Sequence, residues 1–232
     1  MRKTLSSVVL LLVLAGTSLF ALDVNFRSEA DLTDNFKAVA GGKSVSVVNE
    51  DGGVLRFTTA DKLTFSRLTL VDRQQRPLGL AEGTVEATFR FKEMQQSFGI
   101  IMRVTDDEAN SYVFLVNLSE SGSSALRIFK VSPKATPEQE HILVFKATKA
   151  IVPNEWYRLR VKITNGVGGG VNLEGEVLPE SGGSPILSAN IKDASDPVDG
   201  PGEINLRLYA TNVPTEIEVK KVSVTPEPTL VR

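Results

Sequence analysis

The chain has 232 residues, of which 41% are hydrophobic and 23% charged, an ordinary composition for a globular protein. It contains no cysteine, which excludes disulfides, thiolate metal sites and cysteine nucleophiles. The 26 basic and 28 acidic residues give a net charge of −2, so the charges are nearly balanced. Binding the phosphates of a nucleic acid needs a concentrated basic patch instead. We therefore expect no nucleic-acid partner.

The first 21 residues have the pattern of an export signal. Two basic residues precede the apolar run 8–15, and small residues then lead to Ala21, after which we expect cleavage; cleavage after Ser18 is the alternative. The apolar run is shorter than the ~20 residues that a membrane-spanning helix needs. We therefore expect a signal peptide at 1–21 and a secreted or periplasmic protein that has no membrane contact after cleavage.

The segment after the signal predicts short strands and little helix. Runs 44–48, 54–58 and 65–70 are rich in β-forming residues and lie around the turn 49–53. The two segments that favour a helix are 29–34 and 137–140.

The middle of the chain gives the clearest strand signals. Residues 83–91 alternate, with Val85 and Phe89 on one face and charged or threonine side chains on the other, the period of a half-buried strand. Runs 97–104 and 112–118 are separated by polar turn formers and predict a hairpin.

The remaining chain continues as strands separated by turns rich in glycine, asparagine, proline and serine. This pattern predicts an all-β protein, a two-sheet antiparallel β-sandwich, rather than βαβ units. No linker-like composition interrupts it, so we expect one domain at 22–226 and a short tail at 227–232. The further predicted strands are 126–131, 142–147, 156–163, 171–177, 186–191, 204–209 and 217–224.

The order of these segments resembles the concanavalin A-like lectin/glucanase jelly roll. It is most similar to the laminin G-like and 3-keto-disaccharide hydrolase-like branches found in exported bacterial proteins. The resemblance lies in the paired strands 97–103 and 112–116, the strand with Trp156 and Tyr157, and the closing pair 202–208 and 216–224. It implies a jelly-roll fold, in which the concave sheet face or the loops at one edge hold sugars.

The glucanases of this fold use a strand of the form E-x-D-x-E or E-x-D-x-x-E, which places carboxylates on one face at a spacing suited to glycoside hydrolysis. The sequence lacks this motif. The nearest pairs, Glu174 with Glu176 and Glu216 with Glu218, fit solvent-exposed positions of ordinary strands. The single histidine, His141, has no second histidine for a metal site, so these residues favour a protein that is not an enzyme.

Calcium is the metal that the sequence favours, as a structural ion. Asp193, Asp196 and Asp199 lie in one turn-rich loop, and calcium takes six to eight oxygen ligands, often several from one loop. A second acidic cluster lies at 106–108. Aspartate is also a common turn former, which is the alternative explanation.

Candidate ligand residues are polar or aromatic side chains of the central strands, because sugars are recognised by flat aromatic faces and by bidentate or amide hydrogen bonds. Arg103 is preferred, since it interrupts an apolar run and should need a partner or a ligand. The alternative for Arg158 and Arg160 is that they are ordinary solvent-facing residues of an alternating strand. For Trp156 the alternative is packing in the core or at its rim. The full set is Arg90, Arg103, Tyr112, Asn117, Arg127, Trp156, Arg158 and Arg160.

These features lead to three hypotheses of function. The first is an exported, non-catalytic carbohydrate-binding or adhesion-type module with a carbohydrate or glycan partner. The second is an enzyme of a concanavalin A-like family that acts on glycosides. The third is a structural or protein-binding extracytoplasmic domain, which a flat or convex sheet of mixed charge would favour.

Overall fold

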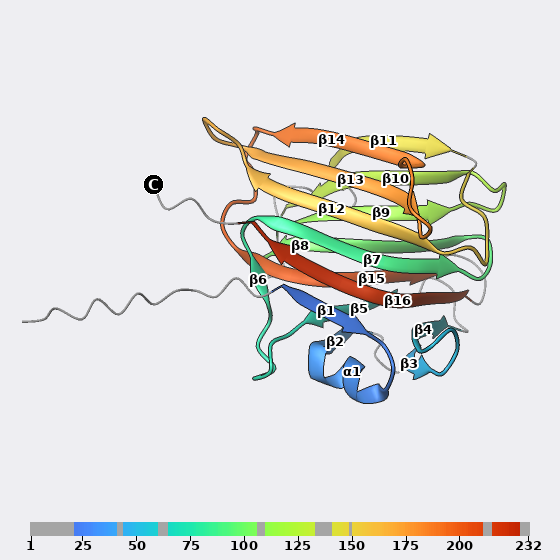
Figure 1. The fold of residues 1–232 in the computed structure, drawn as a ribbon. Helices are drawn as coiled ribbons and strands as arrows, with labels where there is room; N and C mark the ends of the chain where they lie inside the picture. The colour runs from blue at the N-terminus through green and yellow to red at the C-terminus, as the bar shows by residue number, and fades with distance from the viewer. Residues whose placement is uncertain are drawn as a thin grey trace, which may run out of the picture.

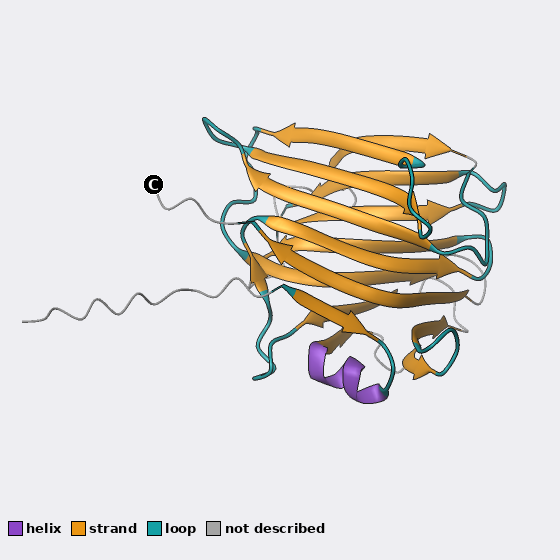
Figure 2. Cartoon of the chain, in the orientation of Figure 1, coloured by secondary structure: helices purple, strands orange, loops and turns teal. Residues whose placement is uncertain are grey.

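The computed structural model describes residues 21–40, 44–59, 65–105, 110–132, 141–148, 150–210 and 215–227. Within these residues, two eight-stranded antiparallel sheets pack face to face (Figures 1 and 2). The predicted all-β sandwich is therefore confirmed. Residues 1–20 of the predicted signal and the predicted helical segment 137–140 lie outside the described residues.

Sheet A contains both terminal strands of the fold. Its strand order is β14-β13-β12-β7-β16-β4-β3, and β1 pairs with β16 beside this path. The bounds of its strands are β1 (Leu22–Asn25), β3 (Val45–Val48), β4 (Val54–Thr59), β7 (Gly83–Phe91), β12 (Tyr157–Asn165), β13 (Val171–Pro179), β14 (Leu187–Asp193) and β16 (Thr215–Pro226).

Sheet B lies behind sheet A in Figure 1. Its strand order is β11-β10-β9-β8-β15-β5-β2, and the short β6 pairs with β15. The bounds of its strands are β2 (Phe36–Ala40), β5 (Phe65–Leu70), β6 (Gly79–Leu80), β8 (Gln96–Val104), β9 (Ser111–Leu118), β10 (Ser124–Val131), β11 (His141–Thr148) and β15 (Gly202–Ala210).

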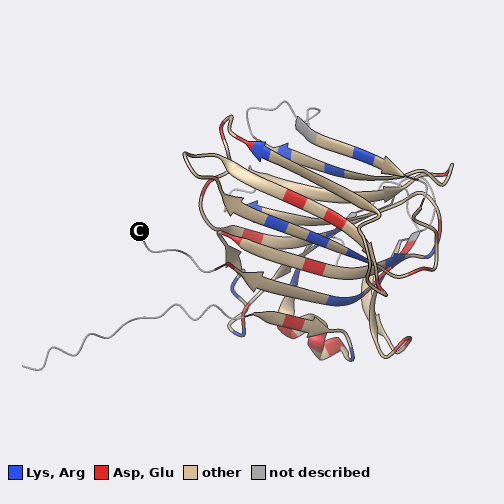
Figure 3. Ribbon diagram, turned by 45° about the horizontal axis from the view of Figure 1, so that its top comes forward, with Lys and Arg blue, Asp and Glu red and all other residues tan. Residues whose placement is uncertain are grey.

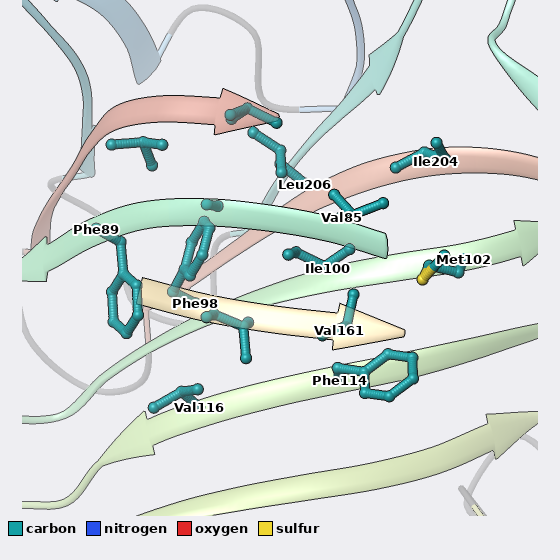
Figure 4. Packing of buried hydrophobic residues seen from close by; sticks show 14 of the residues in the cluster. Val85, Phe89, Phe98, Ile100, Met102, Phe114, Val116, Val161, Ile204 and Leu206 are labelled. Atoms are coloured by element: carbon teal, nitrogen blue, oxygen red, sulfur yellow. The ribbon is translucent and has the colours of Figure 1, made fainter. Parts of the chain in front are cut away.

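The core lies between the two sheets and is made of the inward-facing side chains, which alternate with outward-facing ones along each strand (Figure 4). In β7, Val85 and Phe89 point inward as the alternation predicts, and both side chains are fully buried. The ring of Phe89 stacks on that of Phe98 from β8, with 4.8 Å between the ring centroids. Facing aromatic residues thus join the two sheets at the centre of the sandwich.

The predicted hairpin and the first predicted helix are both confirmed. Strands β8 and β9 pair antiparallel from Gln96 opposite Leu118 to Met102 opposite Tyr112. The helix α1 (Glu29–Asn35) follows Ser28, whose backbone N–H donates to the Asp31 carboxylate at 2.8 Å. Among the described residues, no helix is long and apolar enough to span a bilayer.

Candidate functional site

The outward face of sheet A is a network of ion pairs. Basic and acidic residues lie beside each other on its strands (Figure 3). Glu86 of β7 accepts hydrogen bonds from Arg158 at 3.3 Å and Arg160 at 2.8 Å, both on β12. Further pairs join Arg160 to Glu176 and Lys162 to Glu227. The charges of this face are therefore largely satisfied by one another.

Glu218 is the buried centre of this network. Sequence alternation predicts a solvent-exposed side chain, but Glu218 is fully buried, so that expectation is wrong. Its carboxylate accepts hydrogen bonds from Arg56 at 2.5 and 3.0 Å and from Arg90 on the other side. Arg56 also contacts Glu216 at 2.9 Å. Both glutamates are thus engaged in ion pairs with arginine side chains.

Trp156 belongs to the same surface. The guanidinium of Arg90 lies over its ring, 4.5 Å from the centroid, and the ammonium of Lys220 lies 5.4 Å from it. Two cations thus already approach the ring of this half-buried tryptophan. The position favours packing at the rim over a sugar platform.

Arg103 lies at one end of the sandwich and not on an outward face. Plain alternation in β8 would place it outward beside Ile101, but the pairing with β15 shifts from Glu203 opposite Val104 to Asn205 opposite Ile101. This β-bulge is accompanied by a φ of 56° at Arg103, in the left-handed region, and it turns the side chain inward. A Cβ on Gly202 would lie 2.5 Å from the Arg103 carbonyl carbon, so glycine leaves room for the bulge.

The Arg103 guanidinium is satisfied by groups of the protein. It donates to the carbonyl oxygens of Ala81 at 2.5 and 3.1 Å and Val198 at 2.7 Å, and to Asn165 Oδ1 at 2.7 Å. Only 1% of the residue is exposed, and burial lowers its pKa, opposed by the charges of Tyr112, Asp199 and Glu82. Arg103 therefore ties the end of sheet B to sheet A, with its predicted need for a partner met inside the fold.

Lys130 of β10 binds the aspartate-rich loop at the end of β14, residues 193–199. Its ammonium donates to Asp193 Oδ2 at 2.9 Å, to the Ser195 carbonyl at 2.8 Å and to the Asp196 carbonyl at 2.9 Å. Tyr112 also donates to Asp193 Oδ2 at 2.8 Å, and burial followed by this bond raises the tyrosine pKa.

An ammonium therefore occupies the position among these oxygens that a calcium ion would need. Across the part of the chain that the structure describes, no group of three or more aspartate, glutamate or histidine side chains is arranged to hold a metal. The second acidic cluster, 106–108, lies outside that part.

The outward face of sheet B differs from that of sheet A in its chemistry. Strand pairing aligns its outward residues in rows, one of which runs from Arg67 through Arg207, Gly99, Leu115 and Arg127 to Phe145. A parallel row runs through Tyr209, Ser97, Asn117, Ala125 and Ala147, and another through Thr69, Asn205, Ile101, Val113 and Phe129. We call the outward residues of these three rows the sheet B face.

Several polar atoms of the sheet B face are buried and have no hydrogen-bond partner within the part of the chain that the structure describes. They are both amide atoms of Asn205, Oγ1 of Thr69, Oδ1 of Asn117 and Nε of Arg127. Buried polar groups are nearly always paired in folded proteins, and each unpaired one costs about 1–3 kcal/mol. Thr69 and Asn205 are almost fully buried, whereas Asn117 and Arg127 are partly exposed. The latter two side chains are therefore the ones that an external ligand could reach.

The sheet B face has one aromatic side chain on β11 and another on β15. Phe145 of β11 is 52% exposed and carries the Arg127 guanidinium over its ring at 5.4 Å. Tyr209 of β15 is half-buried, with Arg207 5.8 Å from its ring centroid. Four strand-to-strand steps separate β15 from β11, which is ~19 Å at the usual strand spacing. Measured across the strands, the sheet B face is therefore longer than a single sugar ring and matches the length of an oligosaccharide.

The structure distributes the predicted ligand residues over three places. Asn117 and Arg127 lie on the sheet B face, Arg103 and Tyr112 are buried at the end of the sandwich, and the others lie on sheet A: Arg90, Trp156, Arg158 and Arg160. Sequence reasoning missed the other members of the sheet B face: Arg67, Thr69, Phe145, Asn205, Arg207 and Tyr209. The alternation of Asn205, Arg207 and Tyr209 with apolar residues was a visible signal, but it does not tell which strands are neighbours.

Comparison with known proteins identifies the fold. No protein-family model matches the sequence, and neither does any curated protein. The β-glucanase of Bacillus licheniformis superposes on 89% of this chain and 98% of its own, with a TM-score of 0.60 and 11% identity. The VIP36 exoplasmic/lumenal domain, in its Ca2+/Man3GlcNAc-bound form, matches 90% of both chains, with a TM-score of 0.61 and 7% identity.

A third similar structure is the carbohydrate-binding module CBM66 from Bacillus subtilis. It covers 81% of this chain and 94% of its own, with a TM-score of 0.52 and 14% identity. The chain has a concanavalin A-like fold. The resemblance seen in the sequence is thereby confirmed at the level of the jelly roll.

Proposed function

We propose that this protein is an extracytoplasmic carbohydrate-binding module that holds an oligosaccharide across the sheet B face without cleaving it. The observation that carries the proposal is the exposed ring of Phe145 beside the partly exposed side chains of Arg127 and Asn117, which have polar atoms without a hydrogen-bond partner among the described residues. Sugar hydroxyls both donate and accept hydrogen bonds, so they suit amide and guanidinium groups. The exposed ring of Phe145 offers the flat apolar surface that sugar rings stack on.

The non-catalytic part of the proposal rests on the carboxylates. Glycoside hydrolysis uses two carboxyl groups on either side of the scissile bond. At the outward positions of β5, β15, β8, β9 and β10 that the structure describes, Glu203 is the one acidic residue. The glutamate pairs of β13 and β16 belong to sheet A, and Glu218 and Glu216 bind Arg56 there. A binding role is therefore the better match.

The proposal is tested by titrating the purified protein with neutral and acidic oligosaccharides in a calorimeter. Removing the side chain of Phe145 or Asn117 by substitution with alanine should weaken binding by about tenfold, or 1.4 kcal/mol. Neither change should alter stability by more than about 0.5 kcal/mol, since Phe145 is exposed and the partly exposed Asn117 accepts no hydrogen bond at Oδ1 from the described residues.

Two matched controls lie elsewhere on the molecule. Val167→Ala removes an apolar side chain that is 85% exposed, and Asn172→Ala removes an asparagine from the outward face of β13. Both should bind as the unmodified protein does. Equal losses in the controls, or no binding to any saccharide, would reject the sheet B face as the site. Shortened products in the incubated samples would reject the non-catalytic part.

A further inference from the structure

We infer that the ligand of the sheet B face is an acidic saccharide, carrying carboxylate or sulfate groups on more than one sugar. This inference rests on the proposed function and narrows it to a chemical class. Three observations support it: the number of basic residues on the face, the lack of a carboxylate partner for Arg127 among the described residues, and the distance between Arg207 and Arg127.

The sheet B face has an excess of positive charge. Arg67 and Arg207 lie opposite each other on β5 and β15, and Arg127 lies in the same row on β10. At the neighbouring outward positions described above, Glu203 is the one carboxylate, and Lys37 on β2 adds a further cation beside Thr69. These outward positions thus carry more basic than acidic side chains, in a protein whose net charge is negative.

Sheet A shows how this protein treats basic side chains that have only a structural role. There, Arg56 and Arg90 share Glu218, while Arg158 and Arg160 share Glu86. Arg127 has no such carboxylate among the described residues. Its guanidinium instead lies over the ring of Phe145, and its buried Nε–H, like that of Arg158 on sheet A, has no acceptor in the described part of the chain.

A guanidinium beside an exposed aromatic ring matches the two parts of an acidic sugar. The fork of N–H groups pairs with a carboxylate or sulfate through charge-assisted hydrogen bonds, and the apolar face of the sugar ring packs on the phenyl ring. Phe145 and Arg127 sit directly opposite each other on β11 and β10, so one sugar can meet both.

The spacing of the arginines indicates a repeating acid. Three strand-to-strand steps separate Arg207 from Arg127, which is ~14 Å at the usual strand spacing. Between them lie Gly99, which has no side chain, and Leu115, whose Cδ1 would be 3.0 Å from a Cβ on Gly99. This central stretch offers an apolar floor between two cationic positions, as a polymer with acidic groups on separate sugars would require.

The test compares acidic oligosaccharides with neutral derivatives of the same length. The probes are an oligogalacturonate and its carboxyl-reduced form, a sulfated galactan oligosaccharide and its desulfated form, and polyglutamate as an anion that is not a sugar. We expect at least tenfold tighter binding of one acidic form than of its neutral partner, with affinity falling as sodium chloride rises. The preferred acid identifies the carboxylate or the sulfate as the ligand group.

Arg127→Gln should remove most of this preference, and Arg160→Gln on sheet A, which is 39% exposed, should keep it. Thermal unfolding of each variant verifies that the fold is intact. Equal affinity for acidic and neutral forms would overturn the acidic ligand and leave the proposed function standing. Equally tight binding of polyglutamate would overturn it too, and no binding of any saccharide would reject both proposals.

Discussion

Lys130 provides an internal cation for the loop that follows β14. All three of its ammonium hydrogens have an oxygen acceptor: one carboxylate and two backbone carbonyls, at 2.8–2.9 Å. The lysine is 8% exposed and its partner Asp193 is 4% exposed. A buried carboxylate of this kind is tolerated only while its counter-charge is present.

Lys130→Met keeps the length of the side chain and removes its charge. We expect it to lower the free energy of unfolding by about 3–5 kcal/mol, because the Asp193 carboxylate is left buried without its cation. Urea unfolding measures this change. The control is Lys220→Met, where a surface pair with Glu180 is lost and about 1 kcal/mol or less is expected.

The double variant Lys130→Met with Asp193→Asn separates charge from packing. It should recover part of the loss, because no uncompensated charge remains. A double variant as unstable as Lys130→Met alone would contradict the account of Lys130 as a counter-ion.

At the scale of elements, Glu218 joins three strands of sheet A. It lies on β16 between Arg56 of β4 and Arg90 of β7, and these strands come from the beginning, middle and end of the fold. Each pair alone would be an ordinary cross-strand contact. The shared buried carboxylate makes the three strands depend on one side chain.

Glu218→Gln should lower the free energy of unfolding by about 3–5 kcal/mol, since two arginines lose their common buried anion. Glu216→Gln is the matched control on the same strand; its side chain is 31% exposed and we expect about 1 kcal/mol or less. Chemical denaturation of both variants in the same buffer gives the comparison. Equal losses would show that burial of Glu218 adds nothing to its ion pairs.

How much of these elements could be predicted depends on how local their causes are. Alternation in β7 gave its core face correctly, because strand period is set by neighbouring residues. The bulge at Arg103 was beyond reach, since it depends on Gly202 in β15, almost a hundred positions along the chain. The contact of Lys130 with Asp193 likewise needs strands from both sheets. Sequence could supply candidate side chains for the site but not which of them share a face.

At the scale of the whole molecule, two buried tyrosines make stability sensitive to alkaline pH. Burial raises the pKa of both Tyr112 and Tyr157 above the ordinary value of about 10. The folded state therefore keeps its phenol protons where the unfolded state loses them. The contribution of the two tyrosines to the free energy of unfolding is fully present below pH ~10, and it should be lost as the pH rises above this value.

Urea unfolding between pH 8 and pH 11 measures this dependence. Stability should decline across the upper part of the range, and Tyr112→Phe should decline less steeply because it removes one of the two phenols. A flat profile to pH 11 in the unmodified protein, or phenolate absorbance from Tyr112 while the protein remains folded, would refute the prediction.

The pairing of β1 with β16 has a practical consequence for handling the protein. Leu22 lies opposite Val224, so the first and last strands of the sandwich meet side by side at one end of sheet A (Figure 1). A tag or a surface attachment joined to either strand would sit on sheet A and leave the opposite side of the sandwich open. Attaching the protein through β1 in one experiment and through β16 in another should therefore present the same sheet B face to a glycan array.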